Sequence, residues 1–276
     1  MFTSTKVLTP EQLRRSVPSA FAVEAHESMS DRYGFISTEQ VINALVNEGF
    51  LPVYARQTNV RDKGKQDYTK HLIRFRHVDV KPVVGDVFPE IVLVNSHDGL
   101  SKYKMDAGLL RLACYNGMVV GEGTISQVAI RHNKNVVDGV LEAAFEITEQ
   151  VPLIAGAVEE MRRVMLNYEE RLVLAKAALV FRYEKEPEDL EEIPVKPGQL
   201  LQVRRYQDKE VQNTLWGTYN IVQENLTKGG VHYNRVNPET HRVRHQTTRE
   251  IKSISEDIKL NKALWTLAEE MKNIKG

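Results

Sequence analysis

The most uneven distribution of charge in this chain lies between Arg56 and His77, in the stretch RQTNVRDKGKQDYTKHLIRFRH. This stretch holds seven Lys or Arg against two Asp, whereas the 37 basic and 37 acidic residues of the whole protein cancel. Local positive charge attracts phosphate groups, and Tyr54, Tyr68 and Tyr103, in and around these basic residues, offer rings on which bases can stack. The stretch therefore predicts contact with single-stranded nucleic acid, without a reading of its sequence.

The side chains expected to make these contacts come from this stretch and from a later segment of the same predicted sheet. Because side chains alternate along a strand, Arg74 and Arg76 should share one face, and we expect that face to be displayed. The lysines between the two strands could instead be ordinary solubility charges on a solvated loop. The expected phosphate contacts are Arg56, Arg61, Lys63, Lys65, Lys70, Arg74, Arg76, Lys102 and Lys104, and the expected stacking platforms are Tyr68 and Tyr103.

A second basic segment runs from Lys228 to Lys252, with six Lys or Arg against two Glu. Its residues are polar and show no period of two or 3.6, so we expect a mobile loop over 229–252. Such a loop could close over a bound strand. Its expected secondary contacts are Arg235, Arg242, Arg244 and Arg249.

Metal and catalytic chemistry have weaker support in the sequence. His26, His97, Asp98 and His132 are scattered and lack the spacing of a zincin, so ordinary hydrogen bonding is the preferred explanation over a metal site assembled in space. We expect no metal and no other cofactor. The chain also has no G-x-G-x-x-G, Walker or G-x-S-x-G motif, and we assign no catalytic residue.

A metal-dependent nuclease is a further alternative, because acids and a lysine lie around one predicted hairpin. Its candidates are Asp86, Glu90, His97, Asp98 and either Lys102 or Lys104. The irregular spacing of these residues and the intervening Pro89 weigh against it.

The elements that must position these residues follow from hydrophobic periodicity and from turn and capping signals. Ser37 and Gln40 predict the start of a helix over 38–48, and Asn167 with Glu170 predicts another over 168–183. Strands are expected over 50–57 and 71–78, in a second hairpin with a turn at Asp98-Gly99, around a turn at Asn116-Gly117, and over 125–130. Further helices are expected over 135–150, 156–166, 208–230 and 255–274.

This order predicts an α+β fold, because strands and helices are segregated along the chain. We expect a mainly antiparallel sheet with a basic β-hairpin, flanked by an N-terminal helix and followed by several C-terminal helices. The predicted domains are an α+β core over 1–183, an acidic, proline-containing linker over 184–200, and a helical region over 201–276.

The expected cellular location follows from two patterns that the sequence lacks. The N-terminus does not have the pattern of a signal peptide, and no apolar run reaches the ~18 residues of a membrane span. We therefore expect a cytoplasmic protein without a membrane partner. The single cysteine, Cys114, lies in an apolar run and is expected to be a buried, inert thiol.

Seven segments spread along the chain resemble one family. They are SVPSAF, HESMSDRY, VRDKGKQDYTKH, PEIVLVNSHDG, NGMVVG, VQENLTKGG and NKALW. In this order they resemble the YfjQ/YafZ family of bacterial prophage and mobile-element proteins, which is part of a broader phage and plasmid family of unknown function. The resemblance spans Ser16 to Met271. It implies a mobile-element setting, where recombination, replication and counter-defence are common tasks, and it carries over no activity.

The coarse order of elements is similar to that of phage and eukaryotic annealing proteins, which combine a helix, a small antiparallel sheet with a basic hairpin, and a long helix. This is an analogy at the level of the fold. From it we expect a non-catalytic single-stranded DNA-binding protein that anneals strands and forms homo-oligomers. An anti-defence or regulatory protein that binds a host protein is the main alternative.

Overall fold

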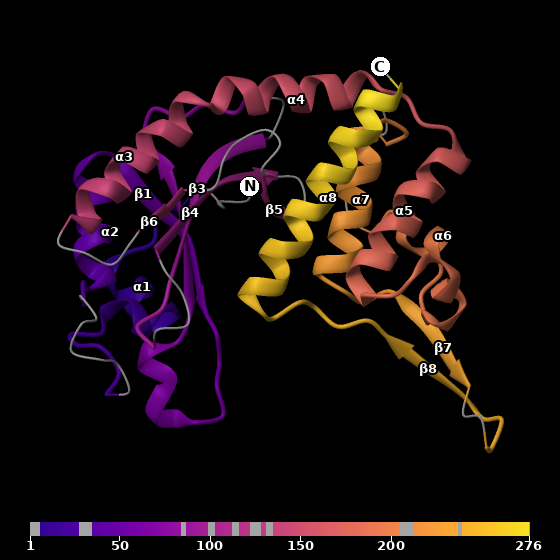
Figure 1. The fold of residues 1–276 in the computed structure, drawn as a ribbon, viewed down its shortest axis with the longest axis horizontal. Coiled ribbons are helices and arrows are strands. Elements are labelled where there is room, and N and C mark those ends of the chain that lie inside the picture. The colour runs from indigo at the N-terminus through magenta and orange to yellow at the C-terminus, as the bar shows by residue number, and fades with distance from the viewer. Residues whose placement is uncertain are drawn as a thin grey trace. The chain divides into compact units, whose positions relative to one another are not determined.

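An antiparallel sheet dominates the first half of the chain (Figure 1). Its strands are rich in apolar residues, and its three central strands are buried at nearly every position. In spatial order the strands are β1 (Phe50–Gln57), β2 (His71–His77), β3 (Val87–Asn95), β4 (Tyr103–Arg111) and β5 (Asn116–Val119), while β6 (Val128–Ile130) also pairs with β4.

This computed structural model describes residues 6–27, 35–83, 87–98, 103–111, 116–121, 128–130, 135–204, 212–236 and 239–275. The chain divides into two compact units, Met1–Ile154 and Ala155–Gly276. The boundary differs from the predicted one, because the residues expected to form a linker over 184–200 lie within the second unit. Ile193 and Val195 of that segment are buried, so its acidic composition does not make it a solvated connection.

Two helices pack on the first unit's sheet, α2 (Thr38–Asn47) and α3 (Val136–Glu149). They cover the face that carries Ile73 and Phe75, and the ring of Phe50 lies 5.5 Å from that of Phe145 on α3. Ser37 caps α2 as predicted, with its side chain accepting from the backbone N–H of Glu39.

The N-terminal segment forms a short helix that the sequence analysis did not anticipate. Helix α1 (Pro10–Ser16) begins with a capping box, in which Thr9 and Gln12 satisfy each other's backbone N–H groups. The 3₁₀ helix η1 (Pro18–Phe21) follows it. The signal was present in the sequence as Thr-Pro-Glu-Gln, but a helix of seven residues carries too little hydrophobic periodicity to stand out.

The second unit is mainly helical. Its central helix α7 (Leu215–Thr227) is buried along its whole length and contacts α5, α6 and α8. The other helices of this unit, with one 3₁₀ helix, are α4 (Val151–Arg163, which spans the unit boundary), α5 (Tyr168–Tyr183), η3 (Pro187–Glu192), α6 (Pro197–Leu200) and α8 (Ile254–Lys275). The capping pair predicted for α5 is present, because Asn167 and Glu170 form a capping box.

The segment expected to be a mobile loop is a two-stranded antiparallel hairpin, β7 (His232–Val236) and β8 (Val243–Thr247). This hairpin, the arm, extends from the helices of its unit (Figure 1). The predicted turn at Asn116-Gly117 is also corrected, since both residues belong to β5. With these changes the α+β class is confirmed. Among the described residues, no helix has the length and apolar character needed to span a membrane.

Candidate nucleic-acid interface

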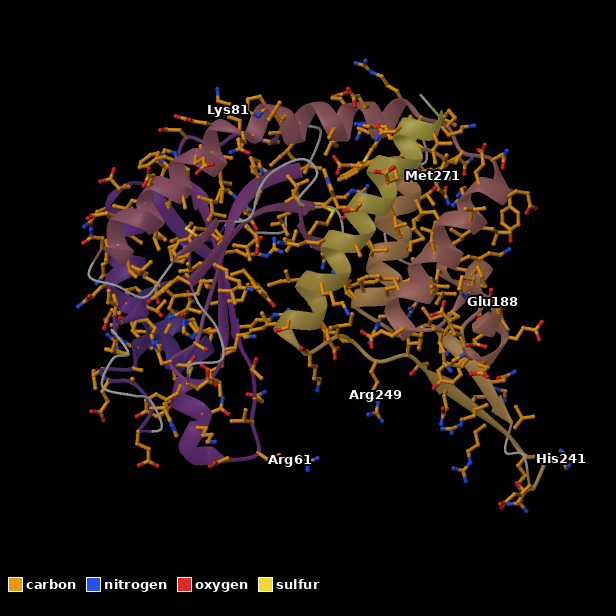
Figure 2. The ribbon with its side chains drawn as sticks, in the orientation of Figure 1. Arg61, Lys81, Glu188, His241, Arg249 and Met271 are labelled. Atoms are coloured by element: carbon orange, nitrogen blue, oxygen red, sulfur yellow. The ribbon has the colours of Figure 1, made fainter. Side chains whose placement is uncertain are left out.

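The first predicted interface, the stretch 56–77, keeps only part of its charge at the surface. Its centre is a 3₁₀ helix, η2 (Lys63–Tyr68), whose start is capped by the carboxylate of Asp62. Arg61 and Lys65 are exposed, and Figure 2 shows the Arg61 side chain at the end of this hairpin. The exposed carboxylates of Asp62 and Asp67 lie within the same short segment and offset this charge.

Several other predicted contacts of this stretch are partly covered. Arg56, Tyr68 and Lys70 are half-buried, and the Tyr68 ring packs edge-on against the ring of His26 with centroids 5.2 Å apart. Lys104 is half-buried on β4. Lys102 lies outside the described residues, as does the side chain of Lys63.

The expectation of a displayed arginine face is wrong. Arg74 and Arg76 do share one face of β2, but both side chains are only 8% exposed and both donate to Glu90 on β3. Arg74 also donates to the backbone carbonyls of Leu109 and Met118. These guanidinium groups are therefore occupied within the first unit and cannot reach a phosphate backbone without breaking buried ion pairs.

The arrangement around Arg74 explains the glycine at position 117. A Cβ atom at Gly117 would lie 2.8 Å from the guanidinium carbon of Arg74. The absence of a side chain there makes room for the arginine, so Gly117 serves the packing of a buried cation inside a strand and not a turn.

Tyr103 was predicted to stack on bases, and this prediction is also wrong. Its side chain is fully buried, and its hydroxyl donates to the carbonyl of Ile36 over 3.0 Å. The same hydroxyl lies 3.3 Å from Oγ1 of Thr38, at the edge of a buried polar cluster. No face of the ring is available to a ligand.

This buried polar cluster surrounds the Thr38 hydroxyl at the N-terminus of α2. Oγ1 of Thr38 lies 3.0 Å from Nε2 of His71 and 3.1 Å from Nε2 of His97. It also accepts a hydrogen bond from Nδ2 of Asn95 over 3.0 Å. Ser19 completes the cluster, 3.0 Å from Nδ1 of His71. The cluster thus joins η1, α2, β2 and β3 inside the first unit.

Burial lowers the pKa of His71 to about 4, and a hydrogen bond to the Thr69 carbonyl opposes that shift. The imidazole is therefore neutral at physiological pH. All members of the cluster are buried, so the cluster serves the packing of the fold.

The described residues form neither the metal site nor the metal-dependent nuclease site that were considered as alternatives. No group of three or more His, Cys, Asp or Glu side chains within the described ranges could hold an ion. Glu90, one of the nuclease candidates, is engaged by two arginines, and His97 is buried in the Thr38 cluster. Asp86, Cys114 and His132 lie outside the described residues.

The arm presents positive charge in a different way from the first stretch. In its ladder Arg235 pairs directly with Arg244, and Tyr233 pairs with Gln246. Side chains of directly opposed residues lie on the same face of an antiparallel pair, so this face carries two arginines and a tyrosine. The Tyr233 hydroxyl donates to Oε1 of Gln246 over 2.8 Å, which fixes the ring on the strand.

The charges of the arm and of the segment that follows it are exposed. Like charges directly opposite each other destabilise a ladder, which makes the Arg235–Arg244 pair unfavourable on its own. Within the described part of the chain, none of the five exposed cations forms an ion pair with a carboxylate. They are Arg235, Arg242, Arg244, Arg249 and Lys252.

A groove of about 410 Å³ lies beside this face, within the second unit. Its buried apolar residues are Val195, Leu200, Leu226, Val231 and Ile251, and its other lining residues include Tyr183 of α5 and Tyr233 of β7. Four cations line it, Arg182, Arg235, Arg249 and Lys252, against two carboxylates, Glu250 and Glu256. The groove therefore combines an apolar base with aromatic rings and a positive rim.

Backbone hydrogen bonds hold the segment 248–251, which borders the groove. Gly230 donates to the carbonyl of Thr248 and Ile251 donates to that of Thr227. Gly229 and Gly230 have φ of +63° and +79°, and Arg204 donates to the Gly229 carbonyl over 2.7 Å. The two glycines thus end α7 as predicted and turn the chain into the arm.

The family model for a domain of unknown function, DUF932, matches residues 25–265. The chain belongs to this family. It is also 41% identical over 263 residues to the UPF0380 protein YafZ of Escherichia coli (strain K12), an alignment that covers 95% of this chain and 90% of YafZ. The UPF0380 protein YfjQ of the same strain is 40% identical with the same coverage. No solved structure matches the chain. The resemblance to the YfjQ/YafZ family is confirmed.

Four arginines of the arm and its flank were predicted from the sequence as secondary contacts, but the tyrosines beside them were not. Tyr183 was assigned only to the end of a helix, and Tyr233 to a loop. The two tyrosines are close because β7, the strand that follows α7, lines the same groove as the end of α5. No local pattern in the sequence encodes this contact. The signal that was present is the alternation of Tyr233 with Arg235, two residues apart on a strand.

Proposed function

We propose that this chain binds single-stranded DNA through the arm and the groove beside it, without catalysing a reaction. The observation that carries the proposal is the Arg235–Arg244 pair, two exposed guanidinium groups directly opposed on one face and without an acidic partner among the described residues. A phosphodiester backbone laid along this face would neutralise both charges and remove their repulsion.

Specificity for single strands is supported by the aromatic residues of the groove. Unpaired bases expose ring faces that stack on tyrosine irrespective of their identity, whereas the bases of a duplex are stacked on each other. The groove offers Tyr183 and Tyr233 next to four cations. This combination of aromatic rings and positive charge is typical of sequence-tolerant single-strand binding.

Strand annealing by a homo-oligomer in a phage or mobile-element setting is the more specific form of the proposal. The support for it is the order of elements, a small antiparallel sheet followed by helices, which resembles that of annealing proteins. Particle mass measured with and without single-stranded DNA tests this level. A ring or filament that forms or grows with DNA supports annealing, and an unchanged monomer contradicts it.

A salt titration of oligonucleotide binding tests the DNA-binding level. We expect the affinity of a labelled single strand, measured by fluorescence anisotropy, to fall steeply with salt. In an Arg235→Ala/Arg244→Ala double variant, the slope of log K against log salt should decrease in magnitude by about 1.4, the value for two lost phosphate contacts to a single strand.

The matched control is an Arg61→Ala/Lys65→Ala variant, which removes the same number of exposed charges from the first unit. We expect its salt slope to stay close to that of the unchanged protein. The proposal fails if no binding is measured at low salt, and binding of a host protein then becomes the leading alternative. If the control variant loses binding and the arm variant does not, the interface is the first hairpin.

A further inference from the structure

The groove beside the arm has the features of a small-ligand pocket in addition to those of a charged surface. Its volume of about 410 Å³ falls within the usual range of about 300–1,000 Å³ for pockets that bind small molecules. Most sequence-independent phosphate contacts need only an open basic surface. A concave site with a buried apolar base therefore points to a second kind of contact, with an apolar and planar group.

Tyr183 is placed to make that contact. It is the last residue of α5, and its side chain is half-buried in the groove. Burial raises the pKa of its hydroxyl; neighbouring Arg182 lowers it and Tyr233 raises it further. Tyr183 and Tyr233 thus line the same groove, although they come from segments 50 residues apart in the sequence.

The polar groups around the tyrosines are largely committed to the fold. Asn225 donates to the carbonyls of Leu200 and Gln202, and the Thr248 hydroxyl accepts from the N–H of Val231. Gln246 accepts from Tyr233. Apart from the charged side chains that line it, the groove therefore offers few hydrogen-bonding groups with which to distinguish one base from another, which suits binding through ring faces.

We propose that this groove is a nucleobase pocket. One base of a bound single strand leaves the stack and lies against Tyr183 and Tyr233, while the adjoining phosphates lie at the cationic rim formed by Arg235, Arg249 and Lys252. The inference rests on the proposed function and adds a base contact to its phosphate contacts. It predicts a ligand that is anionic and carries an aromatic ring, and little discrimination between the four bases.

Comparison of a normal oligonucleotide with an abasic one of the same length tests the pocket. Both have the same phosphates, so they differ only in the bases. We expect the unchanged protein to bind the normal strand about 10-fold more tightly at the same salt concentration, with similar salt slopes for the two strands. Equal affinities would overturn the nucleobase pocket and leave phosphate binding intact.

Replacement of Tyr183 by leucine localises the effect. Tyr183→Leu should weaken binding of the normal strand about 10-fold and leave the abasic strand unaffected. Tyr168→Leu is the matched control, because Tyr168 begins the same helix and is 58% exposed away from the groove. A Tyr183→Leu variant that retains the preference for bases would overturn the pocket. If neither strand binds at low salt, the proposed function fails and the pocket with it.

Discussion

Arg76 donates a 2.6 Å hydrogen bond from Nη2 to Oε1 of Glu90, in the interior of the first unit. The second oxygen of the same carboxylate accepts from Arg74 over 3.2 Å. The guanidinium of Arg76 also lies 4.4 Å from the centre of the Phe88 ring. One carboxylate thus serves two buried cations, and β2 is tied to β3 by charge as well as by its ladder.

Replacement of Glu90 by glutamine should therefore destabilise the first unit strongly. The amide keeps the shape of the side chain but leaves two buried guanidinium groups without a counter-charge, and breaking a buried pair in this way costs about 3–5 kcal/mol. Both tryptophans, Trp216 and Trp265, lie in the second unit, so urea unfolding of the sheet should be followed by far-UV circular dichroism.

Glu39→Gln is the control for this prediction. Glu39 pairs with Arg14 at the surface of the same unit, where an ion pair contributes less than about 1 kcal/mol. A loss for Glu90→Gln as small as that of the control would show that the buried carboxylate is not needed to hold the two arginines.

The ion pairs of Arg74 and Arg76 with Glu90 show what the sequence can predict here and what it cannot. Alternation correctly put Arg74 and Arg76 on one face of β2, because side-chain direction in a strand follows from local geometry. Whether that face is covered depends on β3, and on Gly117 and Met118 of β5, whose backbone approaches Arg74. A distant contact of this kind leaves no periodic signal near the arginines.

The strands of the arm were not predicted because too few of their residues are buried. A strand is recognised in a sequence when one of its faces is buried and apolar residues alternate with polar ones. The strand β8 is exposed at most of its positions, so its side chains show no such alternation. In contrast, α5 was predicted with its observed ends, since the capping pair Asn167 and Glu170 acts within a single turn.

The buried imidazole of His71 predicts a dependence of stability on pH. Its pKa is lowered from the usual 6.5 to about 4 in the folded protein, so the unfolded state binds the proton more readily. The free energy of unfolding should be highest above pH 6.5 and fall by about 3 kcal/mol as the pH drops towards 4. Urea titrations at several pH values, followed by circular dichroism, measure this slope.

His71→Gln provides the control for the pH dependence, because glutamine does not titrate in this range. In this variant the contribution of residue 71 to the slope of the free energy of unfolding against pH, between pH 6.5 and 4, should vanish. This holds whatever the absolute stability of the variant. His97, whose ring centre lies 5.6 Å from that of His71, stays in place in both proteins. A slope that is unchanged in the glutamine variant would assign the pH dependence to other groups.

Removal of a buried tyrosine hydroxyl should affect the free energy of unfolding differently at two positions, Tyr219 and Tyr103. The Tyr219 side chain is buried between Trp216 and Trp265, with ring centres 5.6 and 6.0 Å away, and no partner for its hydroxyl is found among the described residues. Tyr219→Phe removes an unpaired polar group, so the free energy of unfolding should stay the same or rise by about 1 kcal/mol. Tyr103→Phe removes a donor to the Ile36 carbonyl and should lower it by about 1–2 kcal/mol.

Tryptophan fluorescence measures the first of these changes, because both tryptophans pack against Tyr219. Circular dichroism measures the second. Equal losses in the two variants would mean that the Tyr219 hydroxyl is paired in solution, and that the contrast between the two sites does not hold.

A methyl group at position 229 should disturb both the fold and the proposed DNA site. A Cβ atom at Gly229 would lie 2.5 Å from the carbonyl carbon of Arg249, and its φ of +63° is unfavourable for alanine. The clash is with backbone, so the segment 248–251, which lines the groove, must shift. We expect Gly229→Ala to lower the free energy of unfolding by more than about 1 kcal/mol and to weaken binding of single-stranded DNA.

Gly156→Ala is a matched control in the same unit. Gly156 lies within α4, nothing stands within 4 Å of the added Cβ atom, and alanine favours a helix over glycine by about 1 kcal/mol. This variant should be as stable as the unchanged protein or more so, and should bind DNA normally. If Gly229→Ala loses stability but keeps its full affinity for the strand, the segment that carries Arg249 does not contribute to the site, and the interface is confined to the arm.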